Sequence, residues 1–148
     1  MIAERLPRIL VAEDNPNDIE LTIAAFEECG LFDQLDIVHN GIEALDYLLC
    51  RGTYSHRESI SPAFVLLDIQ MPGLDGIEVL KNIRRSADLK NLPVVMLTSS
   101  NMESDVLTCY LEGANGYVVK PINFDEFVNK IKGIGVYWAT INTSPCKI

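Results

Sequence analysis

The sequence predicts an α/β fold in which a parallel sheet of five strands is covered by helices on both faces. Short apolar runs of strand length alternate five times with segments of helical periodicity, and this alternation is typical of a parallel sheet. Four of the runs end abruptly at polar residues, namely Glu13-Asp14, Asp68, Thr98-Ser99 and Lys120. The carboxyl ends of parallel strands meet at one edge of the sheet, where open α/β folds bind their ligands. We therefore expect the functional site at that edge.

Length and charge limit the function further. The 148 residues suffice for one domain, with an expected core at 8–134 and a C-terminal extension at 135–148. The net charge of −9 is poorly suited to binding nucleic acid or an anionic membrane surface. No apolar run approaches the ~20 residues that span a membrane, and the first residues carry no signal-peptide pattern. We expect a cytoplasmic protein without nucleic-acid or membrane partners.

The first strand is expected at residues 8–12 and the second at 35–39, with a helix between them. Asn15 is placed to cap this helix, Pro16 suits its first position, and Gly30 ends it.

A second helix is expected after the Asn40-Gly41 turn. Four apolar residues are expected on one side of this helix, namely Ile42, Leu45, Leu48 and Leu49. The segment 51–62 is polar and has no periodic pattern, so we expect a surface loop there.

The third strand is a continuous apolar run at 64–67, which stops at Asp68 and precedes a Pro72-Gly73 turn. Such a run indicates a strand that is buried on both faces. Asp68 could simply begin the loop, because Asp is a common turn residue. The next helix ends in Arg84-Arg85, where cations suit the helix dipole, and its apolar residues are Ile77, Leu80 and Ile83.

The last two strands are expected at 94–97 and 117–119. The helix between them is stopped by Gly113 and carries Val106, Leu107, Tyr110 and Leu111. Asn123 is placed to cap the last helix, and Glu126 completes a capping-box spacing. That helix carries Phe127, Ile131 and Ile134.

Right-handed crossover connections favour the flavodoxin-like strand order 2-1-3-4-5. Asp14 and Asp68 then face each other across the point where the order reverses. Neighbouring carboxylates stay ionised together only if a cation joins them, and Mg²⁺ prefers such oxygen ligands. A carboxylate can also act as a nucleophile and become an aspartyl phosphate, while Lys120 can pair with phosphate. The alternative is a structural Asp–Lys ion pair beside a hydroxyl group.

These residues resemble the receiver domains of two-component response regulators. The resemblance extends over about 8–134 and rests on Glu13-Asp14, Asp68 with Met71-Pro72-Gly73, Thr98-Ser99 and Lys120-Pro121. It implies that Asp68 accepts a phosphoryl group from a histidine kinase. Such a protein promotes its own phosphorylation but is not an enzyme in the ordinary sense.

The resemblance also implies the roles of the surrounding residues. Mg²⁺, for which Mn²⁺ or Ca²⁺ can substitute, would be bound by Glu13, Asp14, Asp68 and the backbone carbonyl of Gln70. Lys120 would bind the phosphoryl group, and its peptide bond to Pro121 would be cis, which proline permits. Thr98 would move toward phosphorylated Asp68 and Tyr117 would follow as an aromatic switch, although Tyr117 could instead be a simple core aromatic. Gln70 and Ser100 are not strong bases, so we expect slow autodephosphorylation.

Part of the sequence is similar to regulators that are paired with cyanobacterial phytochrome kinases. The similarity rests on the loop 51–62, the PGLDG turn, the LKNLPVVMLTSS stretch and the Tyr137-Trp138 tail. It implies that the cognate histidine kinase is a phytochrome.

Three rival functions use related features. Phosphatases with an aspartate nucleophile need a second acid two residues later, where this chain has Gln70. Flavin-binding electron carriers need a loop that holds phosphate, which Glu13 and Asp14 would repel. A degenerate receiver acting only as a dimerisation or interaction module would not need all the acidic and basic positions of the site.

The C-terminal extension is unusually apolar and predicts assembly. Large exposed aromatics mark interaction sites, so we expect a homodimer through the fourth helix, fifth strand, fifth helix and tail. Its expected contacts are Tyr117, Phe127, Tyr137 and Trp138, with Trp138 near the centre. The alternative is that the tail folds back on the body of the protein.

The cysteines and histidines match no metal-site spacing, and no disulfide framework is expected. These residues are Cys29, Cys50, Cys109, Cys146, His39 and His56.

Overall fold

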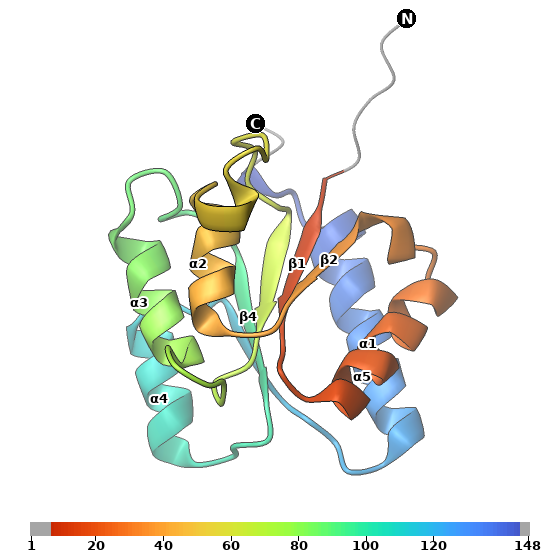
Figure 1. Cartoon of the computed structure of the whole chain (residues 1–148). Coiled ribbons are helices and arrows are strands. Elements are labelled where there is room, and N and C mark those ends of the chain that lie inside the picture. The colour runs from red at the N-terminus through yellow and green to blue at the C-terminus, as the bar shows by residue number, and fades with distance from the viewer. Residues whose placement is uncertain (1–6, 146–148) are drawn as a thin grey trace, which may run out of the picture.

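The computed structural model describes residues 7–145 and contains one parallel sheet with the strand order β2-β1-β3-β4-β5 (Figure 1). The strands are β1 (Ile9–Ala12), β2 (Leu35–Val38), β3 (Phe64–Leu67), β4 (Val94–Thr98) and β5 (Gly116–Val119). Each strand lies within one residue of its predicted position, and the predicted flavodoxin-like order is confirmed.

Helices cover both faces of the sheet (Figure 1). The α-helices are α1 (Pro16–Glu28), α2 (Gly41–Leu48), α3 (Gly76–Arg85), α4 (Glu103–Leu111) and α5 (Phe124–Val136). Two short 3-10 helices, η1 (Phe32–Gln34) and η2 (Gly52–Tyr54), and a π-helical turn, η3 (Tyr137–Ile141), complete the elements. Helices α1 and α5 pack together on one face, and α2, α3 and α4 cover the other. Within the described residues, no helix has the length and apolar character needed to cross a membrane.

The sheet separates two hydrophobic cores because successive strand residues point to opposite faces. Leu10 and Ala12 of β1 belong to the core under α2, α3 and α4, whereas Ile9 and Val11 belong to the core under α1 and α5. All residues of β1, β3 and β4 are buried. These continuous apolar runs therefore form the centre of the molecule, with the two less apolar strands at the edges.

Side-chain caps define where the helices begin. The Asn15 side chain accepts hydrogen bonds from the backbone of Asn17 and Asp18, as expected, and Pro16 opens α1. Asn123 accepts from the Glu126 backbone at the start of α5. Each cap satisfies a backbone N–H group that has no partner inside the helix.

In two helices, several of the apolar residues that define the helical pattern are exposed. In α2 the residues Leu45 and Leu48 are buried, whereas Ile42 and Leu49 are exposed. Tyr47 is buried as well and donates its hydroxyl hydrogen to Asp36 of β2. In α4 the side chains of Leu107, Tyr110 and Leu111 are exposed, and Cys109 is the helix's buried residue. Exposed apolar residues at positions i, i+3 and i+4 form one stripe on a helix. The apolar spacing of α4 therefore marks its outer surface, not its core face.

The predicted surface loop at 51–62 is anchored by one arginine. The guanidinium of Arg57 lies 4.1 Å from the centre of the Tyr47 ring and donates from Nε to the Tyr47 carbonyl at 2.8 Å. Its Nη1 donates to the Ile60 carbonyl at 3.0 Å. A polar segment without periodicity is thus held against α2 by stacking and hydrogen bonds.

The tail packs partly against its own protomer, which was the alternative to an interface. Trp138 is half-buried on the core under α1 and α5, and the buried Ser144 hydroxyl donates to the Ala63 carbonyl at 2.9 Å. Phe127 is 2% exposed and lies in the same core, so its predicted contact in a dimer is wrong. Trp138 keeps part of its surface exposed, so its place near the centre of a dimer interface stays a prediction. Tyr137 remains exposed, while Cys146 lies outside the described residues.

Glycine at position 76 allows α3 to start directly beside Asp68. A Cβ atom on Gly76 would lie 2.0 Å from the carbonyl oxygen of Asp68, whereas a Cβ on Gly133 in α5 would meet no atom within 4 Å. We expect Gly76→Ala to lower the free energy of unfolding by about 1–3 kcal/mol because the turn must shift. Gly133→Ala should raise it by about 0.5–1 kcal/mol, because alanine favours a helix interior.

Urea denaturation of both variants provides the measurement. If Gly76→Ala and Gly133→Ala changed the free energy of unfolding equally, the close approach of residue 76 to the Asp68 carbonyl would not require glycine.

Candidate functional site

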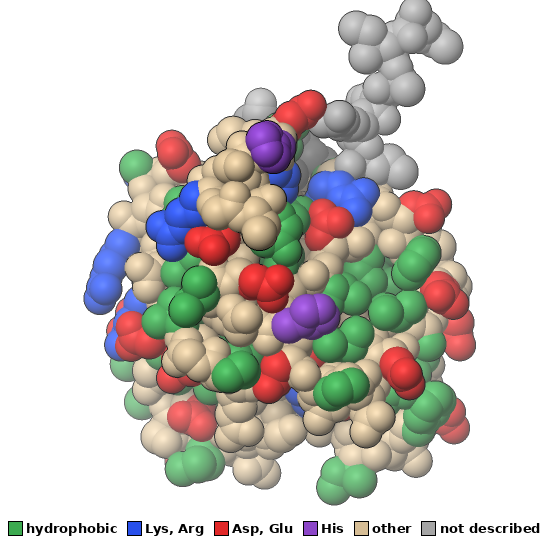
Figure 2. Space-filling view, viewed as in Figure 1, with side chains coloured by type: hydrophobic (Ala, Val, Ile, Leu, Met, Phe, Trp, Pro, Cys, Tyr) green, Lys and Arg blue, Asp and Glu red, His purple; other side chains and the backbone are tan. Residues whose placement is uncertain are grey.

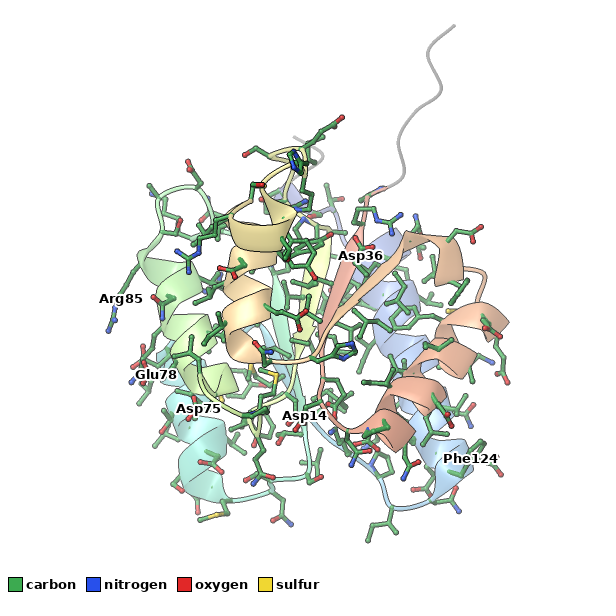
Figure 3. All side chains as sticks on the ribbon, in the orientation of Figure 1. Asp14, Asp36, Asp75, Glu78, Arg85 and Phe124 are labelled. Carbon is green, nitrogen blue, oxygen red and sulfur yellow. The ribbon has the colours of Figure 1, made fainter. Side chains whose placement is uncertain are left out.

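The parallel register brings the polar strand ends together. Ala12 of β1 pairs with Leu67 of β3, and the Asp68 backbone N–H donates to the Ala12 carbonyl at 3.1 Å. Glu13 and Asp14 therefore leave β1 beside Asp68, at the lower end of the sheet in Figure 3, where Asp14 is labelled. The predicted edge is thus the place where the acidic residues gather.

Three carboxylates form a group that could hold a metal ion. One carboxylate oxygen from each of Glu13, Asp14 and Asp68 lies within 4.8 Å of the others. Glu13 and Asp68 are only 3% and 5% exposed, while Asp14 is exposed. Burial and the charge of Asp68 raise the pKa of Glu13 to about 8, despite the nearby Lys120 ammonium. A buried acid that resists ionisation beside another acid fits a site completed by a divalent cation.

Lys120 enters the same group from the end of β5. Its Nζ lies 2.9 Å from Asp68 Oδ2 and 3.0 and 3.1 Å from the two Glu13 carboxylate oxygens. The Lys120 side chain is 7% exposed. Although burial lowers its pKa, hydrogen bonds to Asp18 and Asp68 raise it on balance, so the ammonium stays charged. The expected cis peptide to Pro121 is wrong, because the peptide bonds of residues 7–145 are all trans.

Asp18 is a member of the site that the sequence analysis missed. Its Oδ2 lies 2.8 Å from Lys120 Nζ, the shortest of the four contacts to that ammonium. Asp18 lies in the first turn of α1, where an acid is already favourable for the helix dipole. The sequence offered one clue to this role, namely that Asp18 follows the Glu13-Asp14 strand end by about one helical turn.

Thr98, Ser100 and Tyr117 form a connected group beside the acids. Thr98 is buried at the end of β4, and its Oγ1 accepts from the Ser100 backbone at 3.4 Å. The half-buried Tyr117 packs on the core and donates from its hydroxyl to the Ser100 carbonyl at 2.8 Å. Ser100 therefore links the strand-end hydroxyl to the aromatic ring, and the core role and the switch role of Tyr117 are compatible.

Gln70 touches the site through its backbone. Its N–H donates to Asp68 Oδ1 at 3.3 Å, and its side chain is exposed. The two oxygens of Asp68 thus have different partners, since Oδ2 faces Lys120. The carboxylate is held in one orientation by both contacts.

The comparisons with known proteins agree with this arrangement. A sequence model of the response regulator receiver domain matches residues 9–132. The chain belongs to this family. The probable methanogenesis regulatory protein FilR2 of Methanothrix harundinacea is 38% identical over 93% of this receiver domain chain and 86% of that protein. The response regulator Rcp1 of Synechocystis sp. is 34% identical over 93% of this chain and 92% of that protein.

Two solved structures are similar to this receiver domain over nearly their whole length. The phosphorylated cyanobacterial phytochrome response regulator RcpA superimposes with a TM-score of 0.88 and 33% identity, covering 95% of this chain and 99% of that one. The Mn²⁺-bound form of Rcp1 has a TM-score of 0.87 and 34% identity, with coverage of 94% and 99%. The fold and the family are therefore shown, and receiver domains of this family interact with histidine kinases.

Proposed function

We propose that this protein is a response regulator that accepts a phosphoryl group on Asp68 from a histidine kinase. The observation that carries the proposal is the position of Asp68, a buried carboxylate 2.9 Å from the Lys120 ammonium and grouped with two other acids. The relative RcpA has been solved in a phosphorylated form. An ordinary structural ion pair would not need three acids at one strand edge.

Asp68 acts as the nucleophile. Its oxygen forms a bond to phosphorus, the phosphorus–nitrogen bond of the kinase phosphohistidine breaks, and the electron pair stays on the imidazole nitrogen. The contacts with Lys120 and the Gln70 N–H orient the two oxygens of the carboxylate for attack on phosphorus. Lys120 neutralises charge on the transferred oxygens as they arrive.

Glu13, Asp14, Asp68 and the Gln70 carbonyl would hold Mg²⁺. The donor set is all oxygen, and the carboxylate group is compact enough to bind one ion. When bound, the ion would neutralise phosphoryl oxygens, as hard divalent cations do in phosphoryl transfer. Mn²⁺ is a suitable substitute, and Rcp1 is known in a Mn²⁺-bound form.

Thr98 and Tyr117 transmit the phosphorylation state. The Thr98 hydroxyl moves toward the phosphoryl group and loses its contact with the Ser100 backbone. Ser100 also accepts from Tyr117 and donates its hydroxyl to Asp105 of α4. Movement of Ser100 therefore changes both β5 and the start of α4, which is a two-state element biased by new contacts.

The lifetime of the phosphorylated form is long. Hydrolysis needs a base near the phosphoryl group, and the flanking side chains Gln70 and Ser100 are not strong bases. The Ser100 hydroxyl is already used as a donor to Asp105.

The partner kinase is a phytochrome in this proposal. The support is similarity to Rcp1 and to the phytochrome response regulator RcpA. FilR2, whose name assigns it to methanogenesis regulation, is also similar, so likeness to the family alone does not select the kinase. A cytoplasmic location stays a prediction from the sequence.

The face shown in Figure 2 carries no continuous basic surface. In the face shown in Figure 2, Lys and Arg side chains are scattered and separated by acidic and apolar ones. This distribution agrees with output through protein contacts instead of nucleic-acid binding.

The output surface is a two-fold homodimer through α4, β5, α5 and η3. Its apolar contacts are the exposed residues Leu107, Tyr110, Leu111, Tyr137 and Ile141.

Leu111 is 76% exposed, so Leu111→Glu should leave the fold intact and convert the dimer to a monomer. Phe32→Glu, at an exposed apolar residue just before the opposite edge strand β2, is the matched control. Sedimentation at tens of micromolar provides the measurement, and a monomeric wild type with or without phosphorylation would contradict the dimer.

The function is tested by incubating wild-type protein with acetyl phosphate and recording its intact mass. A gain of one phosphoryl group in Mg²⁺ and none in the presence of a chelator is expected. No gain in either condition would contradict the proposal.

A further inference from the structure

Lys120 has one partner that stands outside the metal-binding group. Its ammonium contacts four carboxylate oxygens, from Glu13, Asp68 and Asp18. Glu13 and Asp68 belong to the three acids that could hold a cation, whereas Asp18 does not. Asp18 also comes from a helix, α1, while the other two acids follow strands.

The other partners of Lys120 have competing roles in the proposed function. Glu13 is a ligand for the cation, and the Asp68 oxygen that faces Lys120 lies at the site of phosphoryl transfer. In the proposed function, the contacts of Lys120 with Glu13 and with Asp68 weaken or change once the metal ion and the phosphoryl group are bound. The contact of Asp18 with Lys120 is independent of these two events, because no bond of Asp18 is needed for metal or phosphoryl binding.

We propose that Asp18 is a positioning residue, which holds the Lys120 ammonium beside Asp68 while Glu13 and Asp68 engage the metal and the phosphoryl group. This inference rests on the proposed function and assigns a role within that same site. Asp18 does not touch the reacting atoms; it acts through Lys120.

The backbone of Asp18 is rigid enough for this role. Its N–H donates to the Asn15 side chain at 3.1 Å, and its carbonyl accepts from the Thr22 hydroxyl at 2.7 Å. On the other side, the Lys120 backbone N–H donates to the Thr98 carbonyl at 2.8 Å. The ion pair thus joins two fixed elements, α1 and the end of β5.

The burial of the pair distinguishes it from an ordinary surface ion pair. Exposed pairs contribute little, because water and salt screen them. Here the Lys120 side chain is 7% exposed and that of Asp18 is 22% exposed. Asp18 therefore keeps some contact with water, while the lysine end of the ion pair is sheltered from it.

The test compares the rates at which acetyl phosphate phosphorylates four proteins in saturating Mg²⁺. They are wild type, Asp18→Asn, Asp18→Glu and the control Glu20→Gln, which removes an exposed acid from the same helix. We expect Asp18→Asn to slow phosphorylation roughly tenfold, because the Lys120 ammonium is then no longer held in the position from which it assists phosphoryl transfer. Asp18→Glu should recover most of the rate, and Glu20→Gln should match wild type. Thermal unfolding of each variant verifies that the fold is retained.

A double-mutant cycle then separates positioning from a general charge effect. In a Lys120→Ala background, Asp18→Asn should cause no further loss of rate, because the group that it positions is absent. Equal loss in both backgrounds, or no loss from Asp18→Asn when Lys120 is intact, would overturn the inference. Absence of phosphorylation in wild type would instead overturn the proposed function, and the role of Asp18 with it.

Discussion

Asp68→Asn is expected to abolish phosphorylation of the chain while leaving it folded. The amide has no ionised oxygen to attack phosphorus, so the loss should be complete rather than partial. Lys120 keeps its contacts with Glu13 and Asp18 in this variant, so the buried ammonium is not left without partners. The same substitution removes one of three acids from the metal group and should weaken Mg²⁺ binding at least roughly tenfold.

The measurement is the intact mass after acetyl phosphate treatment, together with calorimetric titration of Mg²⁺. Asp33→Asn, at an exposed acid in η1, serves as the control and should behave as wild type. Stoichiometric phosphorylation of Asp68→Asn at another residue would show that Asp68 is not the sole acceptor.

Lys120→Ala is expected to impair both stability and function. It removes the cation that contacts two almost fully buried acids, Glu13 and Asp68. Breaking a buried ion pair from one side costs several kcal/mol, so the metal-free free energy of unfolding should fall by about 3 kcal/mol. Mg²⁺ should restore more stability to this variant than to wild type, because the ion replaces the missing positive charge. Phosphorylation should slow at least roughly a hundredfold, as expected for loss of a charge that stabilises the transition state.

Lys132→Ala provides the matched control for stability. Lys132 pairs with Glu28 at 3.1 Å, but both side chains are substantially exposed. Its removal should change the free energy of unfolding by less than about 1 kcal/mol. Urea denaturation with and without Mg²⁺ compares the two variants, and equal effects would contradict the buried role of Lys120.

The strands and helix starts could be predicted from the sequence, because each depends on residues that are close together in the chain. The apolar runs at β1, β3 and β4 are buried on both faces, so they are continuous in sequence and easily recognised. Their polar ends then locate Glu13, Asp68 and Thr98 without further information. The caps at Asn15 and Asn123 follow equally from short-range chemistry.

The features that sequence analysis missed depend on contacts between distant residues. Asp18 looked like an ordinary first-turn acid, because its pairing with Lys120 spans 102 positions of the chain. The outward stripe on α4 has the same spacing as an inward one, so periodicity alone could not assign its direction. The sequence left open whether Trp138 packs on the body of the protein, because the tail's path across the core could not be derived from its composition.

The most direct test of the central claim is to phosphorylate the wild-type protein in Mg²⁺ and reduce it with borohydride, which converts an aspartyl phosphate to homoserine. Peptide mass spectrometry then locates the reduced residue. We predict homoserine at position 68 alone, both after transfer from a phosphorylated histidine kinase and after acetyl phosphate treatment. Homoserine at another position, or a phosphorylated protein in which no aspartate is reduced, would contradict the assignment of Asp68 as the phosphoryl acceptor.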